Sequence, residues 1–274
     1  SWFLNGVPQE KGIGVKTFTF QTGDTGKTTT VSVSAKTFDG FLIEKSLTIQ
    51  SAEVDMLFEA QTYTPPFYKG KALNTHQGGL RLIALPHFIG SDGVKISPNN
   101  LVYQWKKDGV ALQNSSGFGK QSVVISGGII VRQALIEVIV SSLDGAIKGV
   151  SRRVFNTDEA KLIVYEESPL YGIRFGKGIQ GSFDLSQDEV TLTAVPYFFS
   201  VESPSELKYS WLMNSRSAAE SSPFITFRNE TGEAGTSRIS VKSESTSKIL
   251  QFASRSFTIK FEGDESDSSF FRQQ

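Results

Sequence analysis

The sequence predicts an all-β protein built from about two and a half copies of one folding unit. Residues 101–126 carry the pattern that identifies the unit, because parts of this stretch recur upstream and downstream. Trp2 stands 103 residues before Trp105, and Trp211 stands 106 residues after it. Around each tryptophan, short segments of alternating apolar residues are separated by Gly, Asn, Asp and Ser, which is typical of strands joined by turns. This spacing indicates tandem copies of one β domain.

The segment that ends in the tryptophan has the pattern of a half-buried strand. Leu101, Tyr103 and Trp105 alternate with Val102 and Gln104, so the first three residues point to one face of the strand. Asp108 and Gly109 follow and predict a chain reversal, because glycine reaches positive φ at no steric cost. We therefore expect the tryptophans and the tyrosines two residues before them to form the structural core. These residues are Trp2, Tyr103, Trp105, Tyr209 and Trp211.

The first copy, residues 1–50, is predicted to be the second half of a module. Strands are expected at residues 2–4, 15–20, 30–35 and 41–49, with a turn at Asn5-Gly6. The opening strands of the unit are missing from this copy. A sandwich without them would expose an apolar groove and an unpaired edge. Either the missing strands lie upstream in a longer chain, or a neighbouring subunit donates a strand and the chain polymerises.

The second copy, residues 51–157, is complete. Strands are predicted at residues 53–60, 80–88, 101–105, 134–142 and 150–155. A Leu-Asp-Gly turn at residues 143–145 precedes the last strand, as a Phe-Asp-Gly turn at residues 38–40 does in the first copy. About seven short strands in such a copy, with the tryptophan on the third, is the pattern of a β-sandwich.

The third copy, residues 158–263, repeats the second with informative departures. Residues 190–198 match residues 80–88 in the pattern Leu-x-Ala-x-Pro-x-Phe. Asn214-Ser215 replaces the Asp-Gly pair after the tryptophan, and Ser245-Thr246 replaces the later Asp-Gly pair, so we expect both turns to be built differently. Residues 264–274 form an acidic and aromatic tail that we predict to be solvated.

The strand pattern and the Tyr-x-Trp segments, Tyr103 to Trp105 and Tyr209 to Trp211, resemble the immunoglobulin-like and PKD-like repeat modules of bacterial cell-surface proteins. The resemblance covers nearly the whole chain. It implies Greek-key sandwiches with no catalytic residues, used as stalks, spacers or adhesin segments. The joints between copies are only three and six residues long, so we expect the sandwiches to be arranged end to end.

Composition excludes several classes of function. The 28 basic and 28 acidic residues balance, so no net field attracts nucleic acid or an anionic membrane. The chain has no cysteine, which rules out disulfides and thiolate metal sites. It contains no apolar run of 18 residues, and we predict no membrane span. Because it begins at Ser1 without Met or a signal peptide, we expect a processed chain or a piece of a longer one.

The sequence contains little that supports a catalytic site or a metal site. His87 lies in a repeated strand position where the third copy has Tyr197, and no Gly-x-Ser-x-Gly pattern exists for a nucleophile, so we predict no enzyme activity. Calcium would bind through carboxylates at the domain joints. The candidates are Glu59, Glu166, Glu167, Asp188 and Glu189. No Asp-x-Asp-x-Asp spacing accompanies them, so we interpret them as solvated surface and predict no cofactor.

Aromatic loops provide the best candidate binding site. Tyr63, Phe67 and Tyr68 lie in one loop rich in aromatic residues and proline, and Tyr171 and Phe175 occupy the related place in the third copy. Rigid aromatic rings can stack on sugars or anchor a protein partner. The competing interpretation is that they cap the end of a sandwich.

The sequence therefore predicts a non-enzymatic structural or adhesive rod segment, located outside the cell or at its surface, with protein partners from self-assembly or from that surface. The first alternative is a module that binds a glycan or a protein through the loop at residues 63–68. Further alternatives are a polymerising subunit completed by strand donation and an accessory domain of an enzyme.

Overall fold

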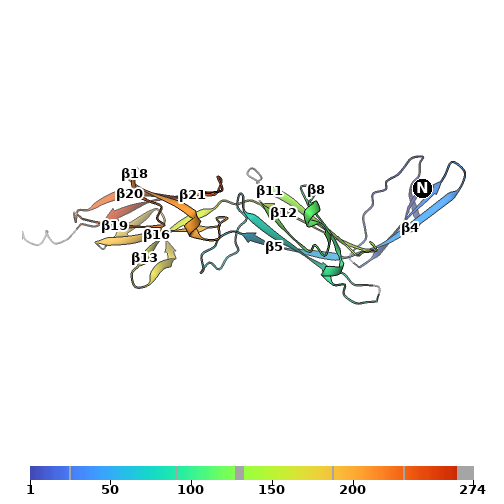
Figure 1. Cartoon of the computed structure of the whole chain (residues 1–274), viewed down its shortest axis with the longest axis horizontal. Coiled ribbons are helices and arrows are strands. Elements are labelled where there is room, and N and C mark those ends of the chain that lie inside the picture. The colour runs from blue at the N-terminus through green and yellow to red at the C-terminus, as the bar shows by residue number, and fades with distance from the viewer. Residues whose placement is uncertain (25, 91, 127–132, 187, 231, 264–274) are drawn as a thin grey trace, which may run out of the picture. The chain divides into compact units, whose positions relative to one another are not determined.

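The fold is all β, as the sequence predicts. A computed structural model describes residues 1–24, 26–90, 92–126, 133–186, 188–230 and 232–263, and the predicted tail at 264–274 lies outside these residues. The described residues contain strands and three single-turn 3-10 helices. Figure 1 follows the chain from the N-terminal strands in blue to β21 in red.

The first ten strands lie between Trp2 and Ser126. They are β1 (Trp2–Leu4), β2 (Val7–Glu10), β3 (Thr28–Lys36), β4 (Leu42–Ser51), β5 (Glu53–Gln61), β6 (Gly79–His87), β7 (Val102–Lys107), β8 (Val110–Ala111), β9 (Gly117–Phe118) and β10 (Ser122–Ser126). The 3-10 helices are η1 (Pro98–Asn100), η2 (Gln113–Ser115) and η3 (Pro204–Glu206).

The remaining strands complete the chain. They are β11 (Gln133–Ser141), β12 (Ile147–Asn156), β13 (Lys161–Ser168), β14 (Gly172–Gly178), β15 (Ser182–Leu185), β16 (Glu189–Tyr197), β17 (Leu207–Met213), β18 (Arg216–Glu220), β19 (Phe224–Arg228), β20 (Gly235–Ser245) and β21 (Phe252–Phe261).

The chain divides into two compact units. The first contains Ser1–Phe58, Arg81–Ile125 and Gln133–Phe155, and the second contains Glu59–Leu80 and the described residues from Asn156 onward. The predicted first and second copies thus contribute to one compact unit, and the predicted module boundaries remain a proposal. The loop between β5 and β6 belongs to the second unit, and this loop forms part of the candidate site.

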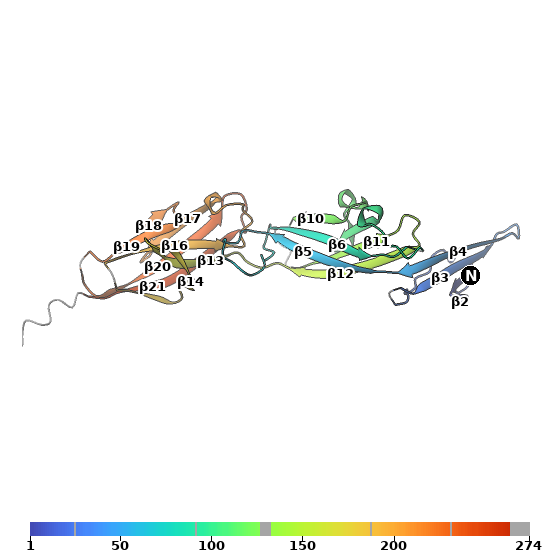
Figure 2. The same cartoon turned by 90° about the horizontal axis from the view of Figure 1, so that it is seen from below.

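The first unit has one large sheet and one small sheet. The large sheet has the order β2-β1-β3-β4-β12-β11-β7-β8, with β9 also paired to β7, and the small one has the order β10-β6-β5. Figure 2 shows β5, β6 and β10 side by side. The half-module at residues 1–51 joins the larger sheet where the end of β4 runs parallel to the start of β12, pairing Gln50 with Ile147.

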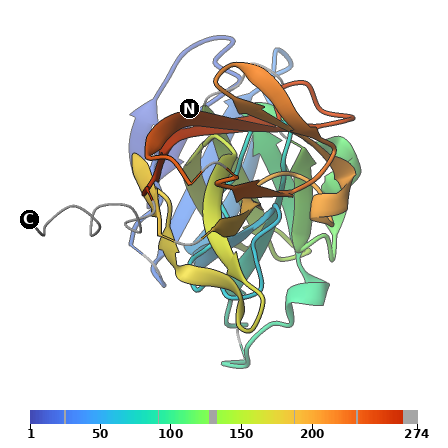
Figure 3. The ribbon, with the colours of Figure 1, turned by 90° about the vertical axis from the view of Figure 1, so that its left-hand side faces the viewer.

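The second unit is a two-layer sandwich. One sheet has the order β14-β13-β16-β19 and the other β15-β21-β20-β17-β18. In Figure 3, β13 and β14 of the first sheet are yellow, and β20 and β21 of the second are orange to red. Buried residues from both sheets form one core, including Val164 and Leu192 from the first and Trp211 and Ile239 from the second. Two sheets with this order, packed face to face, are an immunoglobulin-like β-sandwich.

The tryptophans of the two complete copies lie at the centre of the cores. Trp105 and Trp211 are both 0% exposed, and Tyr103 and Tyr209 are also buried. Each indole N–H donates to a backbone oxygen, from Trp105 to Lys120 at 2.9 Å and from Trp211 to Ser222 at 3.0 Å. A buried indole N–H needs such a partner, because leaving it unpaired would cost the energy of its desolvation.

The tyrosines are fixed by a motif that the sequence analysis missed. Each follows a Ser-Pro-initiated 3-10 helix, and the Tyr103 hydroxyl donates to the Pro98 oxygen at 2.8 Å, as Tyr209 does to Pro204 at 3.4 Å. Burial raises the pKa of Tyr103 and of Tyr209 to about 12 in each case. Both hydroxyls therefore remain protonated donors at neutral pH.

Trp2 differs from the predicted buried core, since it is only partly buried. Among the described residues, no second sheet covers the part of its sheet formed by β1, β3 and β4, and Phe18 stacks on its ring at 5.9 Å between centroids. The predicted strand at residues 15–20 is also absent, and β2 forms instead. Alternation alone cannot make a strand without a neighbouring strand to pair with.

The turn after each tryptophan has one conformation in all three places. Asn5-Gly6, Asp108-Gly109 and Asn214-Ser215 all have positive φ at both residues, the geometry of a type I′ turn. The expectation that Asn214-Ser215 would be built differently was therefore wrong. Ser215 takes a φ of 68° that normally favours glycine.

A side-chain hydrogen bond explains why this turn tolerates serine. The Asn214 Oδ1 accepts from the Arg238 backbone N–H at 2.9 Å, and the Asn214 N–H donates to the Arg238 oxygen at 2.8 Å. Asp108 makes the same double contact with Leu135, and Asn5 makes it with Thr30. The first turn residue thus holds the turn to a neighbouring strand, whichever residue follows it.

The later hairpin does change, as predicted. Gly40 and Gly145 have positive φ in the two Asp-Gly turns, whereas the third copy uses a wider loop in which the Ser245 N–H donates to the Gln251 oxygen at 2.8 Å. The wider loop places the side chain of Gln251 in the interior, 1% exposed.

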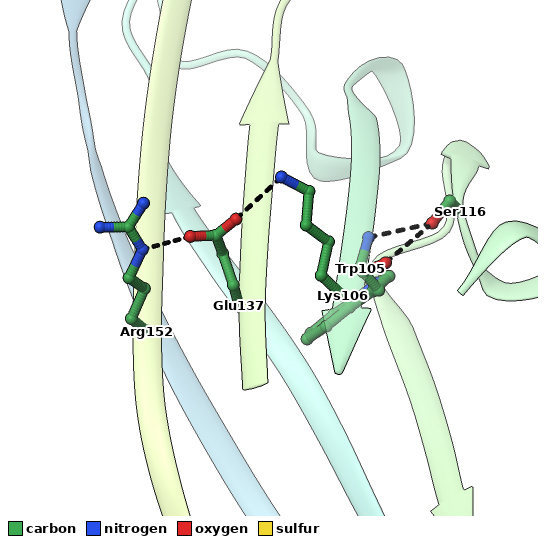
Figure 4. A network of polar contacts seen from close by, with 5 residues as sticks. All are labelled: Trp105, Lys106, Ser116, Glu137 and Arg152. Atoms are coloured by element: carbon green, nitrogen blue, oxygen red, sulfur yellow. Dashed lines mark hydrogen bonds and ion pairs between the residues drawn. The ribbon is translucent and has the colours of Figure 1, made fainter. Parts of the chain in front are cut away.

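A charged contact crosses the outer face of the large sheet beside Trp105. Figure 4 shows Glu137 between Lys106, at 3.1 Å, and Arg152, while the Ser116 hydroxyl accepts from the Trp105 N–H at 2.9 Å. Burial acts to raise the pKa of Glu137, but hydrogen bonds and charges from Arg152 and Lys106 outweigh burial, and the pKa is lowered. The ionised carboxylate therefore stabilises the fold.

Replacing Ser215 with Gly is expected to raise the free energy of unfolding by about 1 kcal/mol, because glycine avoids the Cβ clash at positive φ. The reciprocal change Gly109→Ser is expected to lower it by a similar amount. A Cβ at Gly109 would have no atom within 4 Å, so conformational strain alone acts there. Urea unfolding followed by tryptophan fluorescence measures both. A less stable Ser215→Gly variant would contradict the strained turn.

The lowered pKa of Glu137 predicts a pH dependence of stability. A carboxyl group with a lower pKa in the folded state stabilises the protein above its ordinary value of 4.5 and loses this effect as the pH falls through the lowered value. Glu137→Gln is thus expected to be less stable than wild type at pH 7, by no more than about 1 kcal/mol because Arg152 is largely exposed. In thermal melts the difference should vanish in strong acid, and Glu44→Gln on an exposed strand is the control. An equal difference at every pH would rule out the ion pair as the cause.

Candidate functional site

The sheet β14-β13-β16-β19 is apolar on both faces. In β13, Leu162 and Val164 point into the sandwich core, so the alternate residues Ile163 and Tyr165 point outward. Tyr165 is nevertheless buried, in a second apolar cluster that contains Val195, Tyr197 and Phe198. A sheet face of this kind requires a cover.

The cover is the segment between β5 and β6, residues 62–78, which we call the docked loop. Its backbone pairs with the end of β16, since the Tyr63 N–H donates to the Phe199 oxygen and the Phe198 N–H donates to the Tyr63 oxygen, both at 2.7 Å. The ring of Tyr68 lies edge-on to Tyr197 at 5.7 Å and to Phe198 at 5.5 Å. The docked loop therefore adds both backbone pairing and aromatic packing to the outer face.

The ring of Tyr68 can lie where it does only because residue 70 is a glycine. A Cβ at Gly70 would overlap the ring and hydroxyl of Tyr68. Phe67, the residue before Tyr68, packs on Phe175 of β14 at 5.4 Å, and Phe175 packs in turn on Tyr165 at 5.3 Å. The two loop aromatics thus contact two different strands of the outer face.

A buried polar network fixes the other end of the docked loop. Gln251 donates through Nε2 to the Thr75 hydroxyl at 3.0 Å and to the His76 oxygen, and its Oε1 accepts from the Ser200 N–H at 2.8 Å. Thr75, itself 1% exposed, donates to the Phe198 oxygen at 2.8 Å. All the polar atoms of the Gln251 amide are engaged, so this network is both costly to break and specific in geometry.

Between the docked loop and the sheet lies a hollow of about 460 Å³. Its walls are mostly aromatic and include two lysines. The lining residues are Pro65, Phe67, Tyr68, Lys69, Lys161, Ile163, Tyr165, Phe175, Tyr197 and Phe198. Phe67 is 71% exposed and Tyr68 37%, so the hollow offers accessible ring surface. We call it the aromatic hollow.

The Tyr197 hydroxyl in the aromatic hollow acts as a hydrogen-bonding group and not as an acid. The Tyr165 and Tyr197 hydroxyls contact each other at 2.8 Å. Burial, reinforced by the hydrogen bond to Tyr165, raises the pKa of Tyr197, and burial also raises the pKa of Tyr63. Both phenols are neutral at physiological pH. The arrangement can therefore stack on a flat apolar surface and place ammonium groups beside it.

The structure brings together three of the five aromatic residues predicted to bind. Phe67, Tyr68 and Phe175 line the aromatic hollow, whereas Tyr63 is used for backbone pairing beside it. Tyr171 is 78% exposed at the turn between β13 and β14 and lies outside the hollow. The sequence analysis missed the wall from β13 and β16, with Tyr165 and Tyr197. The sequence signal for this wall was an apolar residue at every position from 162 to 165, which indicates a strand buried on both faces.

Three of the five carboxylates considered for calcium are engaged in other contacts. Glu166 pairs with Arg174 at 3.2 Å, Glu189 with Arg228 at 2.6 Å, and Glu167 accepts from the Thr193 hydroxyl. Within the described ranges, no three His, Asp or Glu side chains group so that they could hold a metal ion. In the same ranges, no helix has the length and apolar character needed to cross a membrane.

Comparison with solved structures finds all-β proteins that match the chain with low TM-scores. No protein-family model matches the chain, and no curated protein matches it. The fibronectin(III)-like modules of Clostridium thermocellum CbhA give a TM-score of 0.23 at 12% identity, covering 76% of this chain and 95% of that one. Bacteroides ovatus SGBP-B in complex with a mixed-linkage heptasaccharide gives 0.21 at 11% identity, covering 94% of this chain and 58% of that one.

A Dscam structure concerned with isoform specificity gives a TM-score of 0.26 at 10% identity and covers 85% of this chain. The chain spans less than two thirds of the length of the SGBP-B and Dscam chains. Scores at this level support no functional inference. The immunoglobulin-like fold is established by the sheets and cores described above.

Gln251→Leu is expected to lower the free energy of unfolding by about 1–3 kcal/mol, because it leaves buried partners in the docked loop unpaired. Hydrogen exchange should accelerate in residues 75–78, while β17 and β20 remain protected. Gln180→Leu makes the same chemical change at an exposed position and is the control. Unchanged exchange in the docked loop would show that the polar network does not hold it.

Proposed function

We propose that the chain is a non-enzymatic structural or adhesive segment of an extracellular or cell-surface protein built from tandem immunoglobulin-like modules, of the PKD-like kind found in bacteria. The recurrence of the tryptophan, its indole hydrogen bond and the type I′ turn supports tandem repetition. A repeat of this kind places its polar and aromatic groups in contacts that hold strands and segments together.

The docked loop is the observation that carries the proposal. Two aromatic rings, two backbone hydrogen bonds and a buried amide network hold this loop on the sandwich. Contacts of this kind resist displacement of the segment, which is what a structural element under tension needs. Catalysis would instead require a nucleophile or a poised acid and base with matched pKa values.

Mechanical unfolding tests the structural role. Pulled from its two ends in a force spectrometer, the chain is expected to unfold in discrete steps, and Gln251→Leu to release its first step at lower force than Gln180→Leu does. A gradual extension with no force peaks, or equal forces for the two variants, would contradict a structural role for the docked loop.

A second candidate function is glycan or protein binding at the aromatic hollow. The exposed ring of Phe67 and the neighbouring ring of Tyr68 favour it, because exposed aromatic rings are the usual platform for stacking on a sugar. This candidate function does not include binding of calcium or of nucleic acid.

A glycan array separates the two candidates. Binding through the aromatic hollow predicts retention on at least one glycan, lost in Phe67→Ala and kept in Tyr171→Ala, since Tyr171 is an equally exposed aromatic residue outside the hollow. Retention that is lost equally in both variants would exclude the hollow as the site.

A further inference from the structure

In both complete sandwiches, the indole hydrogen bond marks the strand that covers the tryptophan. Lys120 accepts from Trp105 and β10 begins two residues later, while Ser222 accepts from Trp211 and β19 begins two residues later. β10 then pairs with β6, and β19 pairs antiparallel with β16. Each covering strand thus lies in a second sheet, supported by a neighbour.

The half-module at residues 1–51 repeats the first part of this arrangement. The Trp2 indole donates to the Val15 oxygen at 3.3 Å, so the covering strand should occupy residues 17–20. Phe18 and Phe20 are the partly buried residues of this segment, and Phe18 stacks between Trp2, at 5.9 Å, and Phe20, at 5.7 Å. Residues 17–20 therefore occupy the place that β10 and β19 have in the other two copies.

Among the described residues, this segment has no neighbouring strand. Residues 17–20 belong to no sheet, and no backbone hydrogen bond joins them to the described residues. Their alternation of Thr and Phe has the pattern of a strand, yet their N–H and C=O groups face no partner strand. Unpaired backbone groups beside an apolar surface are the template on which a further strand adds.

The sheet beneath is mostly apolar, with Lys45 between Ile43 and Leu47 on the same face, and it is only partly covered. Trp2, Leu4, Val31, Val33 and Leu47 share one face of β1, β3 and β4, because their registers place them directly opposite one another. The row nearest the open edge is exposed, with Leu47 at 51%, and Ile43 on the same face is 52% exposed. In the complete first-unit sandwich, Trp105 and its neighbour Val138 are 0% exposed beneath β6 and β10.

We propose that this half-module is a strand acceptor, which binds an extended polypeptide segment from outside residues 1–274. The segment adds antiparallel to residues 17–20 and lays its apolar side chains over Leu47 and Ile43. Its chemistry is that of β6 and β16, in which apolar residues alternate and a proline comes near the end. The proposal goes beyond a structural role, because it assigns the chain an assembly site.

An extended strand fits this site better than other occupants do. A helix has its backbone groups already paired and cannot satisfy those of residues 17–20. A second copy of residues 1–274 has its β6 and β16 already held within its own sheets. An added strand satisfies the backbone and buries the exposed apolar row in one step.

Peptide binding to the full chain tests the proposal. The probe is a fluorescent peptide of residues 79–88, GLRLIALPHF, followed by fluorescence anisotropy, and the control is a scrambled peptide of the same composition. Two further peptides carry backbone N-methyl groups, one at odd and one at even positions. Strand pairing predicts that one methylated peptide binds and the other does not, because alternate N–H groups point to opposite sides of a strand.

Bound peptide should also slow hydrogen exchange at residues 17–20. Equal binding of the scrambled peptide would overturn the proposal, as would equal binding of both methylated peptides. Concentration-dependent dimerisation through the same face, seen by sedimentation without peptide, would overturn the choice of an external segment and point to a second copy.

Substitutions on the two faces of β4 locate the site. Leu47→Asp places a charge on the apolar face and is expected to weaken peptide binding by roughly tenfold or more. Ser46→Asp makes the same addition on the opposite face of the same strand and is expected to leave binding unchanged. Both residues are exposed, so both variants should fold, and Ile43→Asp provides a second test of the apolar face. Equal loss in Leu47→Asp and Ser46→Asp would place the site elsewhere.

Discussion

The hydrogen bond from each buried indole to a backbone oxygen is the contact on which the rest of the structure depends. The tryptophan belongs to one sheet, and its acceptor lies two residues before a strand of the opposite sheet. One bond therefore satisfies a polar group in the core and fixes the distance between the two layers. Because an unpaired indole N–H would be costly at that depth, the connection from one sheet to the other has little freedom in where it crosses.

The core and the turns could be predicted because their causes are local. Alternation around Trp105 and the glycine after Asp108 each act within a few residues. The Asn214-Ser215 turn shows where local rules fail, since a side-chain bond to Arg238 on another strand keeps the same conformation without glycine. The Ser-Pro sequence before each tyrosine was equally local and was simply not used. Its role becomes clear only once Tyr103 is seen to bond Pro98.

The candidate site was predictable in part, because half of it arises from contacts between distant residues. The aromatic loop was evident, but its partners come from β14, β13 and β16, and the amide of Gln251 meets Thr75 across 176 residues of sequence. The sequence pattern that could have warned of a covered sheet is the unbroken apolar run in β13. An all-apolar strand within a sandwich means that both of its faces are buried, so something other than the opposite sheet must cover the outer one.

The same reasoning separates two segments that pack aromatic residues on a sheet, the docked loop and residues 17–20. The docked loop pairs its backbone at Tyr63 and the side chain of Thr75 with Gln251, so its packing of Tyr68 is stable without any ligand. Residues 17–20 have the rings of Phe18 and Phe20 in place but no partner for their backbone. Aromatic packing is satisfied in both, and only backbone pairing differs. Since backbone groups near an apolar surface are the costly ones to leave unpaired, the second segment, and not the first, is where the fold is open to another chain.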